Sequence, residues 1–251
     1  MKIYSWNVNS LRSCETAFLD FIDRYSPDIV MLQELRAHPD QLSFFLKLVP
    51  GYGCLFNDSG RAGYAGTAIY YKDSLPVSEV TNELGDDLLE AEGRAIFLRI
   101  GDFSIYNFYI PNGNSSEERL KYKLKYHEKI LNLAQSRKNE KVILGGDFNV
   151  AHTSSDLYLG KANNSGFLPE ERRWFDEMLA QGFHDTFRMF EKRKGFYSWW
   201  HLRDPERKAN NGWRFDYFLA SDPLKDSIMN AGISREVFGS DHCPIWVEIE
   251  E

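Results

Sequence analysis

Short apolar runs separated by polar or glycine-containing stretches recur along the chain, and this pattern predicts β-strands. We expect strands at residues 2–8, 28–33, 64–71, 94–100, 103–110, 141–144, 196–200, 213–219 and 244–249. Gly101 and Asp102 separate two of these runs, as the turn of a hairpin would. The chain shows no internal repeat, linker or low-complexity tract, so we expect one domain spanning residues 1–251.

Three other stretches have the spacing of helices. The first covers residues 14–25, and the third begins at Pro169 and ends before Gly182. The second follows a capping box formed by Ser115 and Glu118. Its apolar face is expected to hold Leu120, Leu124, Ile130 and Leu131. The basic residues mostly lie outside that face, which favours a solvated surface over a DNA groove: Arg119, Lys121, Lys123, Lys125 and Lys129.

Many strands and a few helices predict an α/β fold in which sheets pack on sheets and helices lie outside. The cysteines Cys14, Cys54 and Cys243 are scattered and odd in number, so we expect free thiols and a reducing compartment. No apolar run reaches membrane-spanning length, and the first residues run directly into a strand pattern. We therefore expect a cytoplasmic protein with no signal peptide and no membrane partner.

The net charge of −7 argues against a protein that coats nucleic acid by charge alone. It leaves room for an enzyme whose acidic residues collect around a cation. The residue types at the predicted strand ends therefore decide the chemistry.

The stretch 143–152 carries the strongest chemical signal. An apolar strand ends in two glycines, which let the backbone turn so that Asp147 and Asn149 emerge at the strand tip. Phe148 between them is expected to turn back into the core. A carboxylate and an amide two positions apart can direct an acceptor and a donor at one reacting atom. Taken alone, the stretch has an alternative interpretation as an Asx-rich turn.

Polar residues stand at the ends of other predicted strands as well. Together with the first tip, they are Asn7, Asn9, Glu34, Tyr109, Asn112, Asp147, Asn149, Asp216, Asp241 and His242. The set is rich in oxygen, holds one histidine and contains no cysteine cluster, which suits Mg²⁺ or Mn²⁺ better than zinc. A cation of that kind beside an imidazole and a carboxylate is apparatus for hydrolysing a phosphate ester.

Six short motifs follow one another along the chain: WNVNSLR at 6–12, LQE at 32–34, YIPN at 109–112, GGDFNVAH at 145–152, GWRFDY at 212–217 and GSDHCP at 239–244. In this order they resemble the signatures of the exonuclease III class of apurinic/apyrimidinic (AP) endonucleases, within the endonuclease/exonuclease/phosphatase family. The resemblance covers residues 2–249. It implies a four-layered αββα sandwich with two packed, mainly antiparallel sheets flanked by helices.

The activity that the resemblance implies is DNA repair. A member of this class is a Mg²⁺-dependent phosphodiesterase that acts on double-stranded DNA and hydrolyses the phosphodiester 5′ to an abasic site. We expect such a protein to be a monomer. The sequence leaves open 3′–5′ exonuclease activity, 3′-phosphodiesterase activity and incision at damaged nucleotides.

The resemblance also assigns roles to the strand tips. Glu34 would be the principal metal ligand, with Asn9 and Asp241 near the cation. Relatives often carry Asp where this chain has Asn9, so this chain departs from the pattern there.

On the phosphate side, Asp147 would orient or deprotonate the attacking water, and Asn149 would hold a phosphate oxygen. His242 would contact the phosphate, with Asp216 fixing its tautomer and orientation. Either Tyr109 or Asp147 would deliver the proton to the leaving group. The phosphate cradle and the support of the site would be completed by Tyr109, Asn112 and Asn7.

Aromatic residues bear on the substrate. Trp199, Trp213 and Phe215 match positions at which this class builds an apolar slot for a flipped-out deoxyribose that carries no base. Flipping costs least where no base is stacked or paired. The alternative interpretation is three core aromatics on strands. Contacts that position the DNA would come from the basic residues of 188–214 and from Arg12, Tyr64, Asn164 and Arg214.

Two rival functions stay open. Another metal-dependent phosphoesterase of the same fold, either a non-specific nuclease or an inositol-phosphate phosphatase, would lack the aromatic slot. A non-catalytic DNA-binding protein would show a degraded metal set. One further departure concerns Asn114 and Ser115, which stand where some relatives place an arginine that wedges into DNA. Duplex distortion and product release can therefore differ from those relatives.

Overall fold

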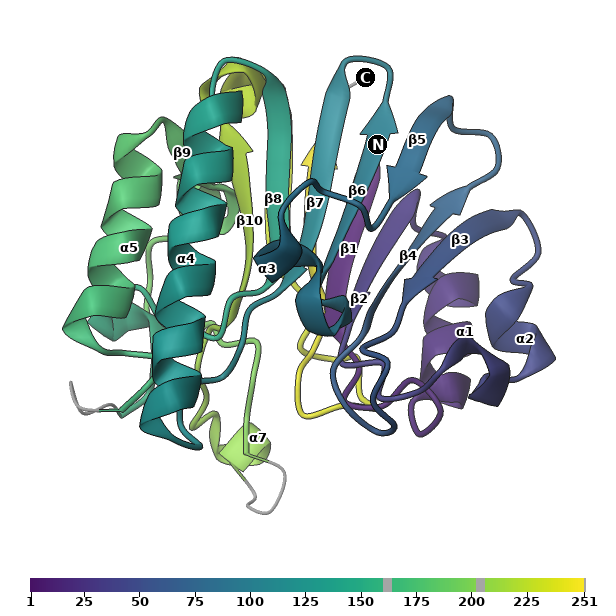
Figure 1. Cartoon of the computed structure of the whole chain (residues 1–251), viewed down its shortest axis with the longest axis horizontal. Coiled ribbons are helices and arrows are strands. Elements are labelled where there is room, and N and C mark those ends of the chain that lie inside the picture. Colours follow the sequence, from purple (N-terminus) through teal and green to yellow (C-terminus); the bar gives the residue numbers. More distant parts are fainter. Residues whose placement is uncertain (160–163, 202–205, 251) are drawn as a thin grey trace.

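Two six-stranded sheets form the centre of the structure, a computed structural model that describes residues 1–159, 164–201 and 206–250 (Figure 1). The first sheet has the order β11 (Ile228–Ile233), β12 (Ile245–Ile249), β1 (Lys2–Asn7), β2 (Ile29–Gln33), β4 (Thr67–Lys72) and β3 (Tyr52–Asn57). The second has the order β5 (Val77–Thr81), β6 (Ala95–Ile100), β7 (Phe103–Tyr109), β8 (Lys141–Asp147), β10 (Asp216–Ser221) and β9 (Phe183–Asp185).

Each described sheet contains one parallel pair, β1–β2 and β7–β8, and its other pairs are antiparallel. Helices cover the outer faces, α1 (Glu15–Tyr25) and α2 (Phe44–Lys47) on the first sheet and α4 (Glu117–Arg137) and α5 (Pro169–Ala180) on the second (Figure 1). The α/β sandwich of two mainly antiparallel sheets flanked by helices is therefore confirmed. Shorter helical elements connect these layers: α3 (Asp87–Glu90), α6 (Thr186–Phe190), α7 (Glu206–Ala209), η1 (Pro39–Gln41), η2 (Ala91–Gly93), η3 (Ser154–Asp156) and η4 (Asp222–Ser227).

Strand alternation explains why both faces of each sheet are apolar. On β1, Ile3 belongs to the core between the sheets, whereas Tyr4 and Trp6 pack under α1 with Phe18 and Phe21. A third core lies under α4 and α5. Inside strands buried on both faces a polar side chain needs a partner within the core, as Asn107 finds in Gln33 at 2.7 Å, so polar groups that can meet a substrate lie at the strand tips.

Several expected boundaries were wrong. The segment 196–200 forms no strand but an isolated bridge at Trp199, and β10 begins at Asp216 instead of Trp213. Strand β4 begins at Thr67, so Tyr64 lies in the preceding loop. The helix cap is Ser116 instead of Ser115, because its hydroxyl accepts the backbone N–H of Arg119. Strands β3, β5, β9 and β11 were not predicted. All four are edge strands with exposed or half-exposed positions.

The buried face of α4 also differs from the expectation. Leu120 and Leu124 are only half-buried, and the buried positions are Lys123, Tyr126, His127, Ile130 and Ala134. Lys123 was expected on the solvated side but is fully buried, because its ammonium forms an ion pair with Glu171 of α5 at 2.6 Å. Among the residues that the structure describes, no helix is long and apolar enough to cross a membrane. Cys14, Cys54 and Cys243 are free thiols, as expected.

Candidate active site

Strand register brings the predicted tips to one edge of the sandwich. Tyr109 ends β7 and pairs in parallel register with Asp147, which ends β8. Asp216, the first residue of β10, pairs with Asp147 from the other side in antiparallel register. In the facing sheet, Asn7 ends β1 next to the end of β2, and Glu34 follows β2 directly. Three of the predicted tips therefore lie on adjacent strands of one sheet, and two more lie at the corresponding ends of the other.

Asp147 is held by the first sheet and by its own loop. Asn7 Nδ2 donates to Asp147 Oδ2 at 2.8 Å across the two sheets, and the backbone N–H of Asn149 donates to Asp147 Oδ1 at 2.9 Å. Gly146 precedes it with φ +129°, and a Cβ there would lie 1.9 Å from the carbonyl oxygen of Phe108. Only glycine can therefore bring β8 so close to β7 at this point. Phe148 points back into the core, as predicted.

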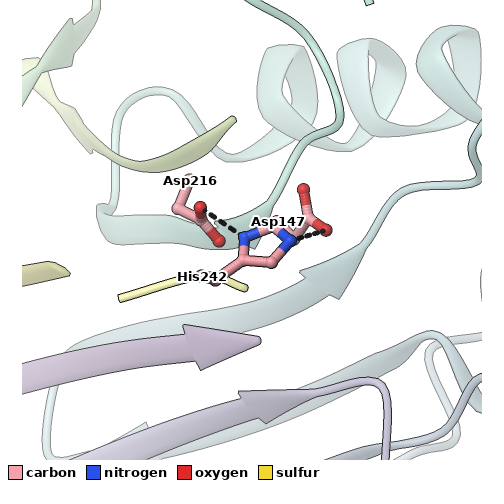
Figure 2. Close-up of side chains that lie close together, drawn as sticks. All are labelled: Asp147, Asp216 and His242. Atoms are coloured by element: carbon pink, nitrogen blue, oxygen red, sulfur yellow. Dashed lines mark hydrogen bonds and ion pairs between the residues drawn. The ribbon is translucent and has the colours of Figure 1, made fainter. Parts of the chain in front are cut away.

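A buried imidazole lies between two carboxylates. His242 Nδ1 is 2.9 Å from Asp216 Oδ2, and its Nε2 is 3.9 Å from Asp147 Oδ2 (Figure 2). Burial lowers the pKa of His242, but the charges of Asp216, Asp147 and Asp241 outweigh this and raise it to about 10. Burial, with Asp216 and Glu34 nearby, raises the pKa of Asp147 to about 7, although His242 opposes that shift. The expected orientation of His242 by Asp216 is thus present in the geometry.

Tyr109 meets the predicted metal ligand. Its hydroxyl donates a short hydrogen bond to Glu34 Oε1, while Arg36 pairs with Glu34 Oε2 at 2.9 Å. Burial and the charge of Glu34 raise the pKa of Tyr109 well above its usual value. The guanidinium of Arg94 lies 4.5 Å from the centre of the Tyr109 ring and donates to the Tyr109 carbonyl oxygen at 3.0 Å. Tyr109 is therefore fixed between a carboxylate and a cation.

Asp241 is a second carboxylate, besides Glu34, that lines the pocket of Asp147 and His242. Asp241 accepts Asn9 Nδ2 at 2.9 Å on one oxygen and Trp199 Nε1 at 2.9 Å on the other. Burial alone would raise the pKa of Asp241, but His242 and these two hydrogen bonds lower it below its usual value. Asp241 is therefore an anion at neutral pH.

One pocket of about 390 Å³ contains most of the predicted site. Its lining includes every predicted metal, catalytic and slot residue except the fully buried Asp216: Asn9, Glu34, Tyr109, Asp147, Asn149, Trp199, Trp213, Phe215, Asp241 and His242. The predicted phosphate ligand Asn112 and the predicted DNA contact Asn164 also line it. The structure therefore brings together what the sequence placed on separate strands.

The aromatic residues form one wall of this pocket. Phe215 lies 5.4 Å from Trp199 and 5.3 Å from Trp213 between ring centres. Both tryptophans are only half-buried, whereas Phe215 is buried behind them. The alternative interpretation, three core aromatics, therefore fails for the two tryptophans, which present apolar surface to the pocket.

Asn149 has little donor capacity left. Its Nδ2 donates to the Ile110 carbonyl oxygen at 3.0 Å and to Asp147 Oδ2 at 3.1 Å, and its Oδ1 accepts Asn112 Nδ2 at 3.2 Å. Its φ of +52° lies in the left-handed region that asparagine tolerates better than most residues. A phosphate oxygen bound by Asn149 would have to replace one of these acceptors.

Two sets of side chains in the site have the chemistry to hold a metal ion, and together they contain four carboxylates. Asp147, Asp216 and His242 are buried, with ligand atoms all within 4.8 Å of one another, and Asp216 Oδ1 has no hydrogen-bond partner among the described residues. Glu34 and Asp241 offer carboxylate oxygens to the same pocket. Carboxylates and one imidazole are ligands that a hard divalent cation accepts.

The predicted DNA contacts had mixed outcomes. Arg12 and Asn164 are exposed, so their prediction stands. Tyr64 is half-buried, and its hydroxyl donates to Glu92 and accepts from Arg94 and Arg119. Arg214 is 1% exposed, with its guanidinium bound to two aspartates, so its prediction as a DNA contact is wrong. Other arginines of 188–214 also bind within the protein: Arg188, Arg193 and Arg207.

Sequence reasoning missed several residues of the pocket. Arg36, Asn114 and Ser165 line it, and Arg94 lies behind Tyr109. Arg36 carried a signal, because it stands two positions after the predicted ligand Glu34. Arg94 is the first residue of a predicted strand, but the sequence gave no sign that its guanidinium would lie on the Tyr109 ring.

A buried imidazole flanked by carboxylates, beside further carboxylates that can hold a cation, has the chemistry to hydrolyse a phosphate ester. Comparison with known proteins agrees: residues 4–242 match the model of the Endonuclease/Exonuclease/phosphatase family. An exodeoxyribonuclease of Bacillus subtilis is 38% identical over 98% of both chains. The chain belongs to this family.

Two solved structures are similar to this chain over its whole length. An AP endonuclease from Archaeoglobus fulgidus superposes with a TM-score of 0.88 and 26% identity, covering 100% of both chains. The 3′ phosphatase NExo from Neisseria, bound to a product DNA hairpin, superposes with a TM-score of 0.89 and 26% identity, also over 100% of both chains. The chain is thus similar throughout to nucleases that act on DNA.

Proposed function

We propose that this chain is a Mg²⁺-dependent DNA-repair endonuclease that hydrolyses the phosphodiester 5′ to an abasic site in duplex DNA, leaving a 3′-hydroxyl. The observation that carries the proposal is a shared pocket: Asp147 and His242 line the same space as the half-buried Trp199 and Trp213. A phosphate at the carboxylates therefore places the neighbouring sugar near the aromatic wall. Similarity to the AP endonuclease and the exodeoxyribonuclease supports the same reaction class.

His242 is the residue best placed to meet the phosphate as a cation. Because its pKa is raised to about 10, it is protonated at neutral pH and can donate from Nε2 to a phosphoryl oxygen. Asp216 holds the opposite nitrogen at 2.9 Å, so the ring cannot rotate away.

Asp147 is the residue proposed to orient or deprotonate the attacking water. Because its pKa is raised to about 7, a large part of Asp147 is charged at neutral pH, and this carboxylate is basic enough to take a proton from water. Asn7 fixes Oδ2 at 2.8 Å, which directs the carboxylate toward the pocket. Tyr109 and Asn112 complete the proposed phosphate cradle from the other side.

Glu34 and Asp241, with Asn9 beside them, are the proposed Mg²⁺ ligands, with Mn²⁺ as an alternative. His242 already has a carboxylate on each side, so a cation placed among Asp147, Asp216 and His242 would repel the protonated ring. The bound cation would stabilise the charge that develops on the phosphoryl oxygens. Tyr109 and Arg36 now occupy the oxygens of Glu34 and would have to share or release them.

The aromatic wall supports abasic DNA over the rival substrates. A base-free sugar exposes apolar carbon that Trp199 and Trp213 can cover, and flipping it costs less than flipping a paired nucleotide. An inositol phosphate, with a hydroxyl or a phosphate group on each ring carbon, would leave its hydroxyls unpaired against indole rings. The intact set of carboxylates and His242 argues against a non-catalytic DNA-binding protein.

A cleavage assay tests the proposal. The substrate is a duplex oligonucleotide with one tetrahydrofuran residue, and the matched control is the same duplex with thymidine at that position. We expect incision 5′ to the tetrahydrofuran with Mg²⁺ and none with EDTA. Equal cutting of both duplexes would point to a non-specific nuclease. A parallel assay on a duplex with a 3′-phosphate measures 3′-phosphatase activity, the activity of the Neisseria protein.

A further inference from the structure

A buried charge cluster lies behind the aromatic wall of the pocket. Arg214 Nε donates to Asp156 Oδ1 at 2.8 Å, and its two terminal nitrogens donate to Asp185 Oδ1 and Oδ2 at 3.1 and 2.6 Å. The guanidinium also lies 4.2 Å from the centre of the Tyr217 ring. We call Arg214, Asp156 and Asp185 the arginine clamp. It joins the loop at 153–157 and strand β9 to the segment that carries the wall.

The clamp holds the backbone as well as the side chain of Arg214. The Arg214 backbone N–H donates to the Asp156 carbonyl oxygen at 2.7 Å, and its own carbonyl oxygen accepts the Tyr217 hydroxyl at 2.9 Å. Asp156 is fixed in turn, because its Oδ2 accepts the backbone N–H and the hydroxyl of Thr153. The three guanidinium nitrogens, the backbone N–H and the carbonyl oxygen of Arg214 are thus all hydrogen-bonded inside the protein.

The two neighbours of Arg214 in the chain are wall residues. Trp213 and Trp199 exchange backbone hydrogen bonds of 2.9 Å, and Phe215 accepts the backbone N–H of Phe148 at 2.8 Å. Both Trp213 and Phe215 lie outside β10, which begins at Asp216. No sheet ladder therefore holds residues 213–215, and the wall depends on a few bridging contacts and on Arg214 between its two members.

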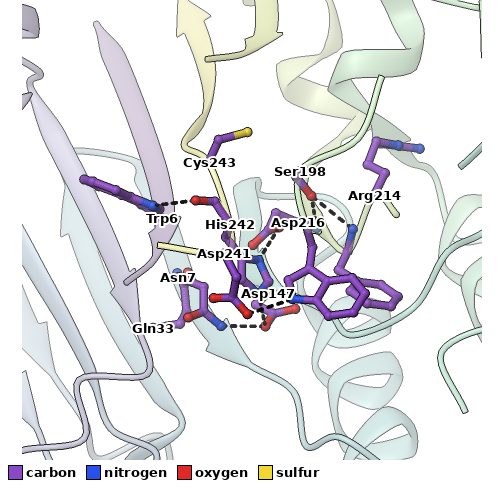
Figure 3. Close-up of polar contacts among 12 residues, drawn as sticks. Trp6, Asn7, Gln33, Asp147, Ser198, Arg214, Asp216, Asp241, His242 and Cys243 are labelled. Carbon is purple, nitrogen blue, oxygen red and sulfur yellow. Dashed lines mark hydrogen bonds and ion pairs between the residues drawn. The ribbon is translucent and has the colours of Figure 1, made fainter. Parts of the chain in front are cut away.

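Asp216, by contrast, is held by strand register. It pairs with Asp147 in the ladder between β8 and β10, and its backbone N–H donates to Ser198 Oγ at 3.2 Å (Figure 3). Strand register thus fixes Asp147 and Asp216. Trp213 and Phe215 are held instead by single hydrogen bonds, including that of the Phe215 backbone N–H to Ser198 Oγ at 3.1 Å, and by the clamp between them.

We infer that Arg214 is a positioning residue for substrate selectivity: it sets the place of Trp213 and Phe215 and thereby the preference for a base-free sugar. This inference rests on the proposed function. Arg214 does not line the pocket, and its guanidinium donates to Asp156 and Asp185, neither of which is a proposed catalytic group. It acts by holding residues 213–215, because its planar fork binds Asp185 through two nitrogens, which lysine cannot do.

The experiment compares Arg214→Lys with Arg188→Met as the matched control. Arg188 donates to the same oxygen of Asp156 at 2.5 Å, but its other hydrogen bonds go to the carbonyl oxygens of Glu191 and Arg193, away from the wall. Two substrates are used, the tetrahydrofuran duplex and the small diester bis(p-nitrophenyl) phosphate, which has no flipped sugar. For Arg214→Lys we expect kcat/KM on the duplex to fall by about 10²-fold, because a misplaced binding group costs that much.

The small diester separates positioning from general damage. We expect its hydrolysis by Arg214→Lys to fall far less than cleavage of the duplex, and Arg188→Met to change neither rate more than about threefold. Equal losses on both substrates, or duplex cleavage by Arg214→Lys within threefold of the wild type, would overturn the inference. If Arg214→Lys does not fold, Asp185→Asn removes the two-nitrogen pair while keeping the bond to Asp156, and the same ratios apply.

Hydrogen exchange tests the clamp without any substrate. We expect faster exchange of the backbone amides of 213–215 in Arg214→Lys than in the wild type, with β8 unchanged, and no such change in Arg188→Met. If the wild type fails to cut the abasic duplex, the proposed function falls, yet this measurement still judges the clamp. Unchanged exchange at 213–215 in Arg214→Lys would refute it.

Discussion

The buried ion pair between Lys123 and Glu171 gives the sharpest test of how α4 and α5 hold the site. Lys123 Nζ donates to Glu171 Oε1 at 2.6 Å and to the carbonyl oxygen of Asn149 at 2.8 Å, and neither charged side chain is exposed. Glu171 also accepts Ser165 Oγ and the backbone N–H of Gly166 and Leu168. The pair therefore ties the Asp147–Asn149 tip to the loop that lines the pocket.

We predict that Lys123→Met lowers the free energy of unfolding by about 3 kcal/mol. Removing one partner of a buried pair costs about 3–5 kcal/mol, because the other charge is left in a dry environment. The three remaining donors to Glu171 soften that cost, which places the expected value at the lower end. For a chain of this length, about 3 kcal/mol corresponds to a fall in Tm of about 6–12 °C. Urea denaturation followed by tryptophan fluorescence measures the first quantity and calorimetry the second.

The matched control lies on the same helix. Lys121 pairs with Glu117 at 2.7 Å, but both side chains are mostly exposed, so Lys121→Met is expected to cost less than about 0.5 kcal/mol. Adding Glu171→Gln to Lys123→Met removes the unpaired charge and should restore part of the loss. A cost below about 1 kcal/mol for Lys123→Met, or no recovery in the double variant, would refute the electrostatic reasoning.

Three further predictions concern the imidazoles and the carboxylates around them. Asp147→Asn and His242→Ala should each lower kcat by about 10²-fold or more, measured in single-turnover cleavage, and a loss of tenfold or less would remove the residue from the mechanism. Asp216→Asn should move the alkaline limb of the pH–rate profile to lower pH. Asp216 is the main cause that raises the pKa of His242 to about 10, and the protonated imidazole is lost as pH rises through that value. An alkaline limb at the same pH in Asp216→Asn would contradict this. Burial lowers the pKa of His127 well below its usual value. As pH falls below about 6.5, the His127 imidazole is therefore protonated in the unfolded chain but stays neutral in the folded protein. Stability should then fall by up to about 1.4 kcal/mol per pH unit from this group, and His127→Phe, which can keep the stacking on Trp174 at 4.1 Å, should remove that part of the slope in urea titrations at pH 5 and 7.

Much of the site could be predicted because buried strands have a strong local signal. The apolar run before Asp147 and the two glycines are read directly from the sequence. In sheets buried on both faces, the polar groups that can reach a substrate lie at the strand ends. The edge strands β3 and β5 were missed because exposed positions break their alternation. Trp199 and Trp213 were assigned to strands because aromatic runs favour them, but tertiary bridges hold these residues instead.

Buried charges were the main failure. Lys123 and Arg214 were both expected to meet solvent or DNA, because a basic side chain in a polar stretch usually does. Their partners lie 48 residues away for Lys123 and 58 and 29 residues away for Arg214. Helical or strand periodicity carries no information at those separations, so only the folded chain reveals the pairing.

The pairing of β1 with β12 has a consequence for synthesis of the protein in the cell. Lys2 faces Glu248 in this ladder, and Asp241 and His242 precede β12 directly. A nascent chain still held on the ribosome short of this point lacks one neighbour of β1 and also lacks the histidine. The nuclease centre is therefore complete only after β12 has been synthesised and has paired with β1.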